Sequence, residues 1–444
     1  MLNKKITFLK SNSGVQKYLK NSSWLLGQKV LDMAVGLFVT VWVVRYLGPS
    51  DFGSLSYALS FVGLFSSIAT LGLDGILVRD LVNEPVRRNY LLGSAFVLRF
   101  VGGVCSLFLI AAGTYFLGES NDDNTLIYII SFGVILRSFN VIDLYFQSKV
   151  LSKYVAYAKT IALGLSSIAK IALLLNGAPL VAFALMVVLE ALVLMVSLIF
   201  FYCKAGFNEV EDTRRKILNW NFDINTAKTL LRDSWPLMLA GIVISIYMKI
   251  DQIMIHRILG AEFVGQYAAA TKLSELWYFI PVLITSSLFP ALINAKKNSK
   301  QLYIVRLQRL YTFLLWLAVS IAIPMTFLSE IIVVRLYGDE YQLASDILRV
   351  HIWAGIFVFI GVASDKWLIT EGIQMFSLRN CAIGALINII LNFYLIGSFG
   401  VVGAAYSTLV SQGLAAYLLL YVSNKTRVNF YAITRAVFIS RAFK

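Results

Sequence analysis

The sequence predicts an all-α membrane protein of about twelve transmembrane helices, arranged in two lobes of six. Composition is the first observation behind this prediction: 59% of the 444 residues are hydrophobic and 14% are charged, whereas soluble domains average about 45–50% and about 25%. One soluble core cannot bury that excess. The second observation is the length of the apolar stretches, and the third is a helix-to-helix turn whose residue pattern occurs twice.

Apolar stretches long enough to span a bilayer recur along nearly the whole chain. About 20 mainly apolar residues are needed to cross roughly 30 Å of hydrocarbon, because no water there can satisfy backbone N–H and C=O groups. Stretches of this kind predict helices over residues 22–44, 54–77, 91–117, 125–147, 154–175, 178–202, 235–258, 271–294, 304–328, 344–368, 375–396 and 401–423.

Basic residues distinguish the two faces of the predicted bundle. Lys and Arg are concentrated in the N-terminal segment and in 79–88, 149–159, 204–232, 296–309, 366–379 and 425–444. Because loops rich in Lys and Arg stay in the cytoplasm, we expect a multi-pass protein of the bacterial inner membrane with both termini cytoplasmic. This distribution accounts for most of the net charge of +15, so no nucleic-acid partner is expected. The first 21 residues lack an apolar run before a small-residue cleavage site, which predicts that no signal peptide is removed.

The repeated turn indicates an internal duplication. Arg45–Gly53 and Arg257–Gly265 both read R-x-L-G-x4-G, one after the first expected helix and one after the seventh. Glycine permits the positive φ angles and close packing that a tight turn between helices needs. Since each half has an even number of helices, we expect the halves to be related by an axis along the membrane normal, with the transport pathway at their interface. The expected parts are an N-terminal lobe, an amphipathic cytoplasmic linker, a C-terminal lobe and a basic cytoplasmic tail: 1–203, 204–234, 235–423 and 424–444.

Charged residues inside the expected helices are the candidate functional residues. Each charge at a helix centre costs about 2.5–3.5 kcal/mol, so together they are expected to face water or a counter-ion rather than lipid. The candidate substrate-binding cations are Arg137, Lys170, Lys249, Lys29, Arg99 and Arg349. The candidate ion-coupling acids are Asp32, Glu190, Asp251 and Glu275.

Several of these charges also have a purely structural interpretation. Lys29 and Asp32 are three residues apart and close enough to pair, and Arg99 is near enough to a helix end to extend its side chain to the membrane surface. For Arg349 the sequence leaves two positions open: its side chain lines a cavity or lies at the membrane interface. Arg137 and Lys170 have no acidic neighbour at helical spacing, which favours a water-filled cavity.

The shared features of the candidate cations predict the class of ligand. Lys249 shares a helix face with Gln252 and His256, as expected of a residue that lines a pathway. The cations come from both halves and outnumber the acids. The cavity is therefore expected to prefer an anion, such as a diphosphate, a carboxylate or a sulfate.

Sequence features of enzymes and pumps are missing. The run closest to a phosphate-binding loop, Gly113–Ser120, ends in Gly-Glu-Ser and lacks the required lysine. The two histidines offer little for acid–base catalysis, and the expected outer loops are too short for a membrane polymerase. Cys105, Cys203 and Cys381 have no metal-ligand spacing. We expect no catalytic residues, no metal site and no organic cofactor.

Several short motifs resemble those of one family of membrane proteins. They are Asn21-Ser-Ser-Trp24, Arg45-Tyr-Leu-Gly-Pro49 with Phe52-Gly53, Asp251-Gln-Ile-Met-Ile255 with Leu259-Gly260, Val264-Gly-Gln-Tyr-Ala268, Lys272-Leu-Ser-Glu275, Pro281, and Gly400-Val-Val-Gly-Ala-Ala405 with Ser411-Gln412. They resemble the polysaccharide flippase family, the O-antigen branch of the multidrug/oligosaccharidyl-lipid/polysaccharide exporter superfamily. The resemblance covers nearly the entire chain and implies a MATE-like fold.

The resemblance implies a function. Members move an undecaprenyl-diphosphate-linked repeat unit of O-antigen, capsule or exopolysaccharide from the cytoplasmic to the periplasmic leaflet by alternating access. The implied partners are the lipid-linked oligosaccharide, membrane lipids, a polysaccharide polymerase and a chain-length regulator. Coupling to a gradient of H⁺ or Na⁺ is implied, and the residues leave both ions open. A cation-coupled exporter of drugs or metabolites from the same superfamily is the alternative.

Overall fold

A computed structural model describes residues 13–118, 120–206 and 220–438, with side chains from residue 23 onward. Most of the expected N-terminal basic segment, Glu119, residues 207–219 of the expected linker and the end of the expected tail lie outside these residues. The described part is helical throughout and contains no β-strand. It holds eleven helices that are long and apolar enough to cross a membrane. The all-α membrane fold predicted from composition is therefore confirmed.

The first two predicted spans form one bent element. Helix α2 (Ser13–Leu64) consists of two helices that meet at Gly48, where φ is 68° and ψ is 175°. Only glycine adopts this backbone conformation readily. Eleven candidate spans in the described residues thus correspond to the twelve predicted segments, because the first of them changes direction at Gly48.

Contacts divide the chain into two units. One unit comprises the residues up to Tyr46 together with Phe61–Ser245, and the other comprises Leu47–Ser60 together with the residues from Ile246 onward. The first contains α3 (Ser66–Thr70), α4 (Leu73–Asn83), α5 (Arg88–Leu117), α6 (Asn121–Leu136), α7 (Val141–Ser148), α8 (Ser152–Leu175), α9 (Leu180–Gly206) and the first part of α10 (Ile224–Leu259).

Two predicted helices of the first unit are interrupted. The helix expected over 54–77 breaks at Leu71 and Gly72, which both have left-handed backbone angles and cannot continue an α-helix. The helix expected over 125–147 changes to a 3₁₀ turn at Arg137–Asn140. The short helix α4 that follows the first break buries Leu73, Leu77 and Leu81 in the core of this unit, at a spacing of four residues.

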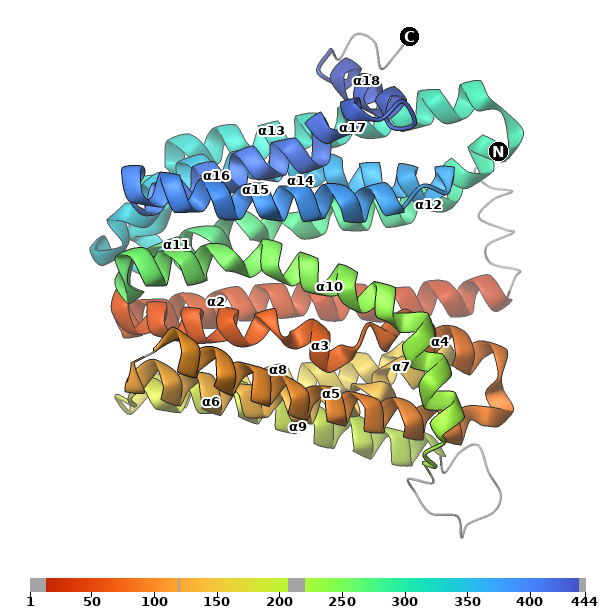
Figure 1. The fold of residues 1–444 in the computed structure, drawn as a ribbon, viewed down its shortest axis with the longest axis horizontal. Coiled ribbons are helices and arrows are strands. Elements are labelled where there is room, and N and C mark those ends of the chain that lie inside the picture. The colour runs from red at the N-terminus through yellow and green to blue at the C-terminus, as the bar shows by residue number, and fades with distance from the viewer. Residues whose placement is uncertain (1–12, 119, 207–219, 439–444) are drawn as a thin grey trace. The chain divides into compact units, whose positions relative to one another are not determined.

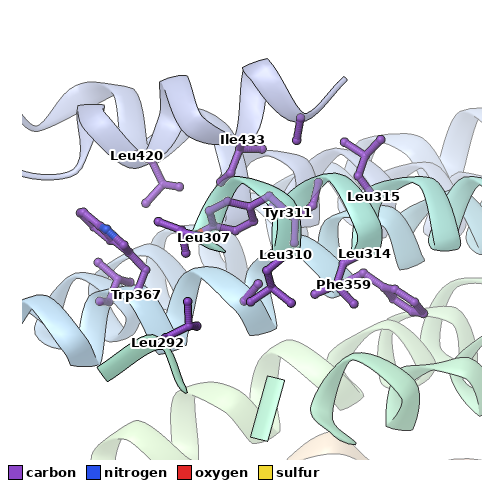
Figure 2. Close-up of a cluster of buried hydrophobic side chains, with 14 of the residues drawn as sticks. Leu292, Leu307, Leu310, Tyr311, Leu314, Leu315, Phe359, Trp367, Leu420 and Ile433 are labelled. Carbon is purple, nitrogen blue, oxygen red and sulfur yellow. The ribbon is translucent and has the colours of Figure 1, made fainter. Parts of the chain in front are cut away.

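The second unit packs long helices around one hydrophobic cluster. It contains α11 (Ala261–Glu275), α12 (Phe279–Asn298), α13 (Lys300–Tyr337), α14 (Gln342–Glu371), α15 (Met375–Phe399), α16 (Val401–Gly413), a π-helical turn (Leu414–Leu418), α17 (Leu419–Val422) and α18 (Arg427–Ala436). Helix α14 packs against both α13 and α16, and α16 packs against α15 (Figure 1). Figure 2 shows this cluster, in which Tyr311 and Leu314 of α13 and Phe359 and Trp367 of α14 are among the buried residues.

The short helix α18, close to the end of the described chain, packs against this cluster. It lies within the expected basic tail and buries Ile433 and Ala436 (Figure 2). Its fully buried Asn429 accepts a hydrogen bond from the Tyr311 hydroxyl at 2.7 Å and donates one to Ser364 at 2.8 Å. A satisfied buried amide of this kind fixes the position of α18 on α13 and α14.

The two copies of the repeated turn have the same backbone form. Gly260 has φ 99° and ψ 177°, close to the angles of Gly48. A Cβ on Gly53 would lie 1.8 Å from the carbonyl oxygen of Ala261, and one on Gly265 would lie 1.9 Å from that of Pro49. Pro49 and Ala261 occupy equivalent positions of the repeat, as do Gly53 and Gly265. The contact is therefore reciprocal, as a two-fold relation between duplicated turns requires.

Candidate functional site

A buried carboxylate forms the centre of the candidate site in the second unit. Asp251 of α10 is 6% exposed and accepts hydrogen bonds from neutral donors on other helices. The Tyr267 hydroxyl of α11 donates to Oδ2 at 2.7 Å, and the Thr408 hydroxyl of α16 donates to the same oxygen at 2.6 Å. Asn392 of α15 donates its Nδ2 to Oδ1 at 2.6 Å. Four helices thus converge on one acidic group.

A second row of amides continues from this carboxylate along α15. The Nδ2 of Asn392 also lies 3.2 Å from Oδ1 of Asn388, whose own Nδ2 donates to Ser411 at 3.4 Å. Asn392 is fully buried, and its Oδ1 has no hydrogen-bond partner in the described residues. An unsatisfied buried acceptor costs about 1–3 kcal/mol and calls for an explanation such as a water or an ion.

The cluster offers oxygen atoms and no basic partner. In the part of the chain that the structure describes, no Lys or Arg makes an ion pair with Asp251. A buried charge without a counter-charge is unfavourable, so this site is suited to binding a small cation or a proton. The described residues hold no group of three or more His, Cys, Asp or Glu side chains that could bind a metal ion.

Two further polar groups lie close to the Asp251 cluster. Buried His351 shares a 2.6 Å hydrogen bond between its Nδ1 and the Ser274 hydroxyl, and its ring meets Tyr267 edge-on at 5.9 Å. Half-buried Glu275 ends α11 within electrostatic range of Lys249 and Asp251. Both predicted coupling acids of the second unit are therefore neighbours.

Three of the predicted cations have acidic partners. Lys170 lies 3.1 Å from Glu190, and Arg99 is buried in an ion pair with Asp74. Glu190 is on the neighbouring helix α9, so spacing along α8 alone could not reveal it. Burial in an ion pair also removes the interpretation of Arg99 as a side chain that extends to the surface.

Arg349 is held in a small polar network on α14 and α13. Its guanidinium contacts Asp346 at 2.8 Å and Glu330 at 3.1 Å, and its Nε donates to Ser329 at 2.9 Å. These contacts satisfy the guanidinium locally. They make Arg349 a structural link between the two helices.

The remaining predicted cations make no close ion pair among the described residues, although Lys249 acts electrostatically on Glu275 and Lys29 on Asp32. Lys29 and Arg137 are exposed in the first unit, and Lys249 is half-buried in the second. Asp32, three residues after Lys29, accepts a hydrogen bond from Gln28 instead. Among the predicted cations that the structure describes, Lys29, Arg137 and Lys249 are therefore the ones without a close ion pair.

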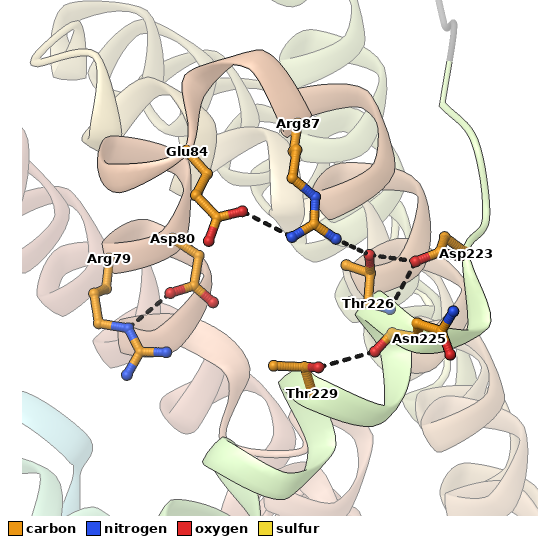
Figure 3. A network of polar contacts seen from close by, with 8 residues as sticks. All are labelled: Arg79, Asp80, Glu84, Arg87, Asp223, Asn225, Thr226 and Thr229. Carbon is orange, nitrogen blue, oxygen red and sulfur yellow. Dashed lines mark hydrogen bonds and ion pairs between the residues drawn. The ribbon is translucent and has the colours of Figure 1, made fainter.

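A network of hydrogen bonds and an ion pair at the surface stabilises the start of α10, the helix that carries Lys249 and Asp251. Figure 3 shows Arg87 donating to Thr226 at 2.7 Å and pairing with Glu84 at 2.8 Å. Asp223 accepts hydrogen bonds from the Thr226 hydroxyl and backbone N–H, which hold the pKa of Asp223 below its ordinary value. This arrangement caps the N-terminus of α10 and ties it to the turn after α4.

The fold and the site define a multi-pass membrane protein with the architecture of MATE-type transporters. One solved structure, an inward-facing multidrug resistance MATE transporter, matches 91% of this chain and 95% of its own with a TM-score of 0.74 and 14% identity. The MatE family model matches residues 236–394.

The family itself follows from the sequence comparison. The polysaccharide biosynthesis protein family model matches residues 18–296, more than half of the chain, and the chain belongs to this family. A probable flippase, AglR of Haloferax volcanii, is 24% identical over 90% of this chain and 82% of its own. The capsular polysaccharide biosynthesis protein CapF of Staphylococcus aureus is 22% identical over 91% of this chain and 98% of its own. The resemblance drawn from the short motifs is thereby confirmed.

Proposed function

We propose that this protein is a flippase that moves a lipid-linked sugar intermediate from the cytoplasmic to the periplasmic leaflet of the bacterial inner membrane. The names of its relatives support this assignment, and one observation carries it: cations without a close ion pair lie in membrane segments of both units. They are Lys29, Arg137 and Lys249. A cation in hydrocarbon is tolerated when water or an anionic ligand meets it. The protein acts as a transporter and catalyses no chemical reaction.

The diphosphate of a polyprenyl-linked sugar is the ligand that suits these three side chains. Arginine can grip two phosphate oxygens with parallel hydrogen bonds, whereas lysine acts as a compact point charge. Arg137 is the first residue of the 3₁₀ turn that follows α6, so its side chain projects from an interruption of the membrane helix. Alternating access would expose these cations first to one face of the membrane and then to the other.

Asp251 is the proposed site of ion coupling. Its carboxylate is surrounded by neutral donors, and the adjacent Asn392 oxygen lacks a partner, so a proton or Na⁺ would complete the cluster. Binding of either ion would neutralise the charge of Asp251, and Lys249 lies two residues before Asp251 on the same helix. Loading of the ion and release of the anionic substrate are coupled in this way.

The proposal has three finer parts. The lipid carrier is undecaprenyl diphosphate, and the sugar is a repeat unit of O-antigen, capsule or exopolysaccharide. The flippase cooperates with a polymerase and a chain-length regulator. The competing function is cation-coupled export of drugs or metabolites, favoured by the MatE match over residues 236–394. The unpaired cations speak for the flippase, because a cationic drug would be repelled by them.

The test uses a strain that lacks the gene and carries variants of it. Arg137→Ala and Lys249→Ala are each expected to reduce surface polysaccharide at normal membrane abundance, and Lys249→Arg is expected to retain more activity than Lys249→Ala. Arg349→Ala, compared at equal membrane abundance, is the control: it removes a cation that Asp346 and Glu330 already pair, so it is expected to lower abundance and to leave the polymer made per molecule unchanged. Wild-type polymer levels in both alanine variants would refute the role of these cations.

A further inference from the structure

A cavity lies beneath the Asp251 cluster, inside the second unit. It has a volume of about 250 Å³, room for about eight water molecules at roughly 30 Å³ each. Its walls come from α10, the 3₁₀ turn Leu276–Tyr278, α14, α15, α16, the π-helical turn and α17, and they are largely apolar. The polar side chains in the wall are Tyr247, Ser364, Asp365, Ser377, Asn380 and Gln412. The function proposed above gives this cavity no role so far.

Asp365 stands at one end of the cavity, near the turn between α14 and α15. It is exposed, and its Oδ1 accepts a 2.6 Å hydrogen bond from the hydroxyl of Ser377. That turn belongs to a segment rich in Lys and Arg, which the charge distribution assigns to the cytoplasm. The cavity therefore has a carboxylate at its cytoplasmic end.

One face of α15 connects this carboxylate to Asp251. Small and polar residues follow each other on that face at intervals of three or four: Ser377, Cys381, Gly384, Asn388 and Asn392. They cover about 22 Å of helix. Ser377 at the first end bonds Asp365, and Asn392 at the other end bonds Asp251.

In the middle of this face, α15 packs closely against the π-helical turn. Gly384 has no side chain there, and a Cβ on it would meet Ala415 at 2.8 Å and the Tyr247 ring at 3.6 Å. Tyr247 borders the cavity, and its buried hydroxyl has no hydrogen-bond partner within the described residues. The facing wall is the π-helical turn Leu414–Leu418, a form that is often found at functional positions.

We propose that this cavity is the cytoplasmic vestibule for the coupling cation, which reaches or leaves Asp251 along the polar face of α15 and is attracted at the mouth by Asp365. The inference rests on the ion-coupled flippase proposed above and adds the route that the ion takes. Asn388 and Asn392 are the buried polar side chains of this face, and polar groups that face the interior of a membrane protein often mark an ion path. The ligand class is a monovalent cation, either Na⁺ or a proton carried by water.

Cys381 in the cavity wall provides a native probe. Cys105→Ser and Cys203→Ser leave it as the single thiol of the chain. Its modification is measured in inverted membrane vesicles with a trimethylammonium and a sulfonate methanethiosulfonate of similar size, each rate divided by that of a free thiol. The cationic reagent is expected to react about three- to tenfold faster, because an opposite charge nearby raises its local concentration.

Two isosteric variants locate the source of that preference. Asp365→Asn is expected to bring the ratio of the two rates close to one, whereas Asp251→Asn is expected to change it little, since Asn392, its partner on α15, lies about 16 Å along the helix from Cys381. Slowing of the cationic reagent by NaCl, compared with N-methylglucamine chloride, identifies Na⁺ as the ion. A cationic preference without such protection identifies a proton route.

Three results would overturn the proposal: equal normalised rates, a preference that survives Asp365→Asn, or failure of both reagents to reach Cys381 from the cytoplasmic side. The labelling needs no sugar substrate. A negative result would thus leave the flippase assignment standing, and loss of polymer in Lys249→Ala would leave the vestibule standing.

Discussion

Alanine at Gly53 or Gly265 is expected to destabilise the protein through the reciprocal contact between the repeated turns. Both glycines are in helices with negative φ, so the backbone accepts a side chain and only space is lacking. The added Cβ would lie 1.8 Å or 1.9 Å from a carbonyl oxygen, where ordinary contact begins at 3.4 Å. The facing backbones must separate by about 1.5 Å, and overpacking of this kind costs about 1–3 kcal/mol.

Matched controls are available in the same fold. Gly36 of α2 and Gly397 of α15 have nothing within 4 Å of an added Cβ. Alanine there should stabilise the helix by about 0.5–1 kcal/mol. Test and control variants should therefore differ by about 1.5–4 kcal/mol.

The assay is the midpoint of thermal unfolding of the purified protein in detergent. Gly53→Ala and Gly265→Ala should unfold below the wild type, and Gly36→Ala and Gly397→Ala at or above it. The unfolding midpoint of the double variant Gly53→Ala/Gly265→Ala should fall by less than the sum of the two single decreases, because the first methyl group already separates the backbones. A Gly53→Ala protein as stable as Gly36→Ala would refute the close contact and the symmetry argument built on it.

Further predictions concern topology, pairing and pH. Cysteines introduced at 119–123 should react with an impermeant thiol reagent from the periplasm and those at 208–216 should not; the reverse pattern would invert the proposed direction of transport. Lys170→Ala should be less stable to heat than the double variant with Glu190→Ala, which leaves no unpaired charge; equal or greater loss in the double variant would contradict the ion pair. The pKa of Asp223 is lowered on folding, so its contribution is present above the unfolded pKa and is lost as the pH falls through the folded pKa. Asp223→Asn should therefore narrow the stability difference between neutral and acidic pH, and an unchanged profile in urea titrations would exclude this cap as a source of acid sensitivity.

The helices were predictable because the membrane leaves the backbone few alternatives, and Gly48 and Gly260 were predictable because few other residues tolerate their angles. Asp251 was recognised as an intramembrane charge. Its partners Asn392 and Thr408 were missed, because neutral polar side chains are common in membrane helices and carry no distinguishing cost. A signal was available, since Asn388 and Asn392 stand four apart on one helix face.

Pairing between helices was the second limit. Glu190 neutralises Lys170 from a different helix, and the spacing within one helix carries no information about its neighbour. The breaks at Leu71 and within Arg137–Asn140 were missed for a related reason. Apolar length predicts that a segment lies in the membrane, and it does not report where local packing bends the helix.

The glycine turns restrict how other proteins can approach this one. Gly260, Gly338 and Gly400 each join two helical elements as a single residue with positive φ. On the proposed topology all three stand on the periplasmic face, where they leave no loop for a neighbour to grasp. A polymerase or chain-length regulator that works beside this protein would find no loop at these three positions, and we expect it to pack laterally against this unit, helix against helix within the lipid. Epitope tags meant to report on the outer surface would have to be fused elsewhere.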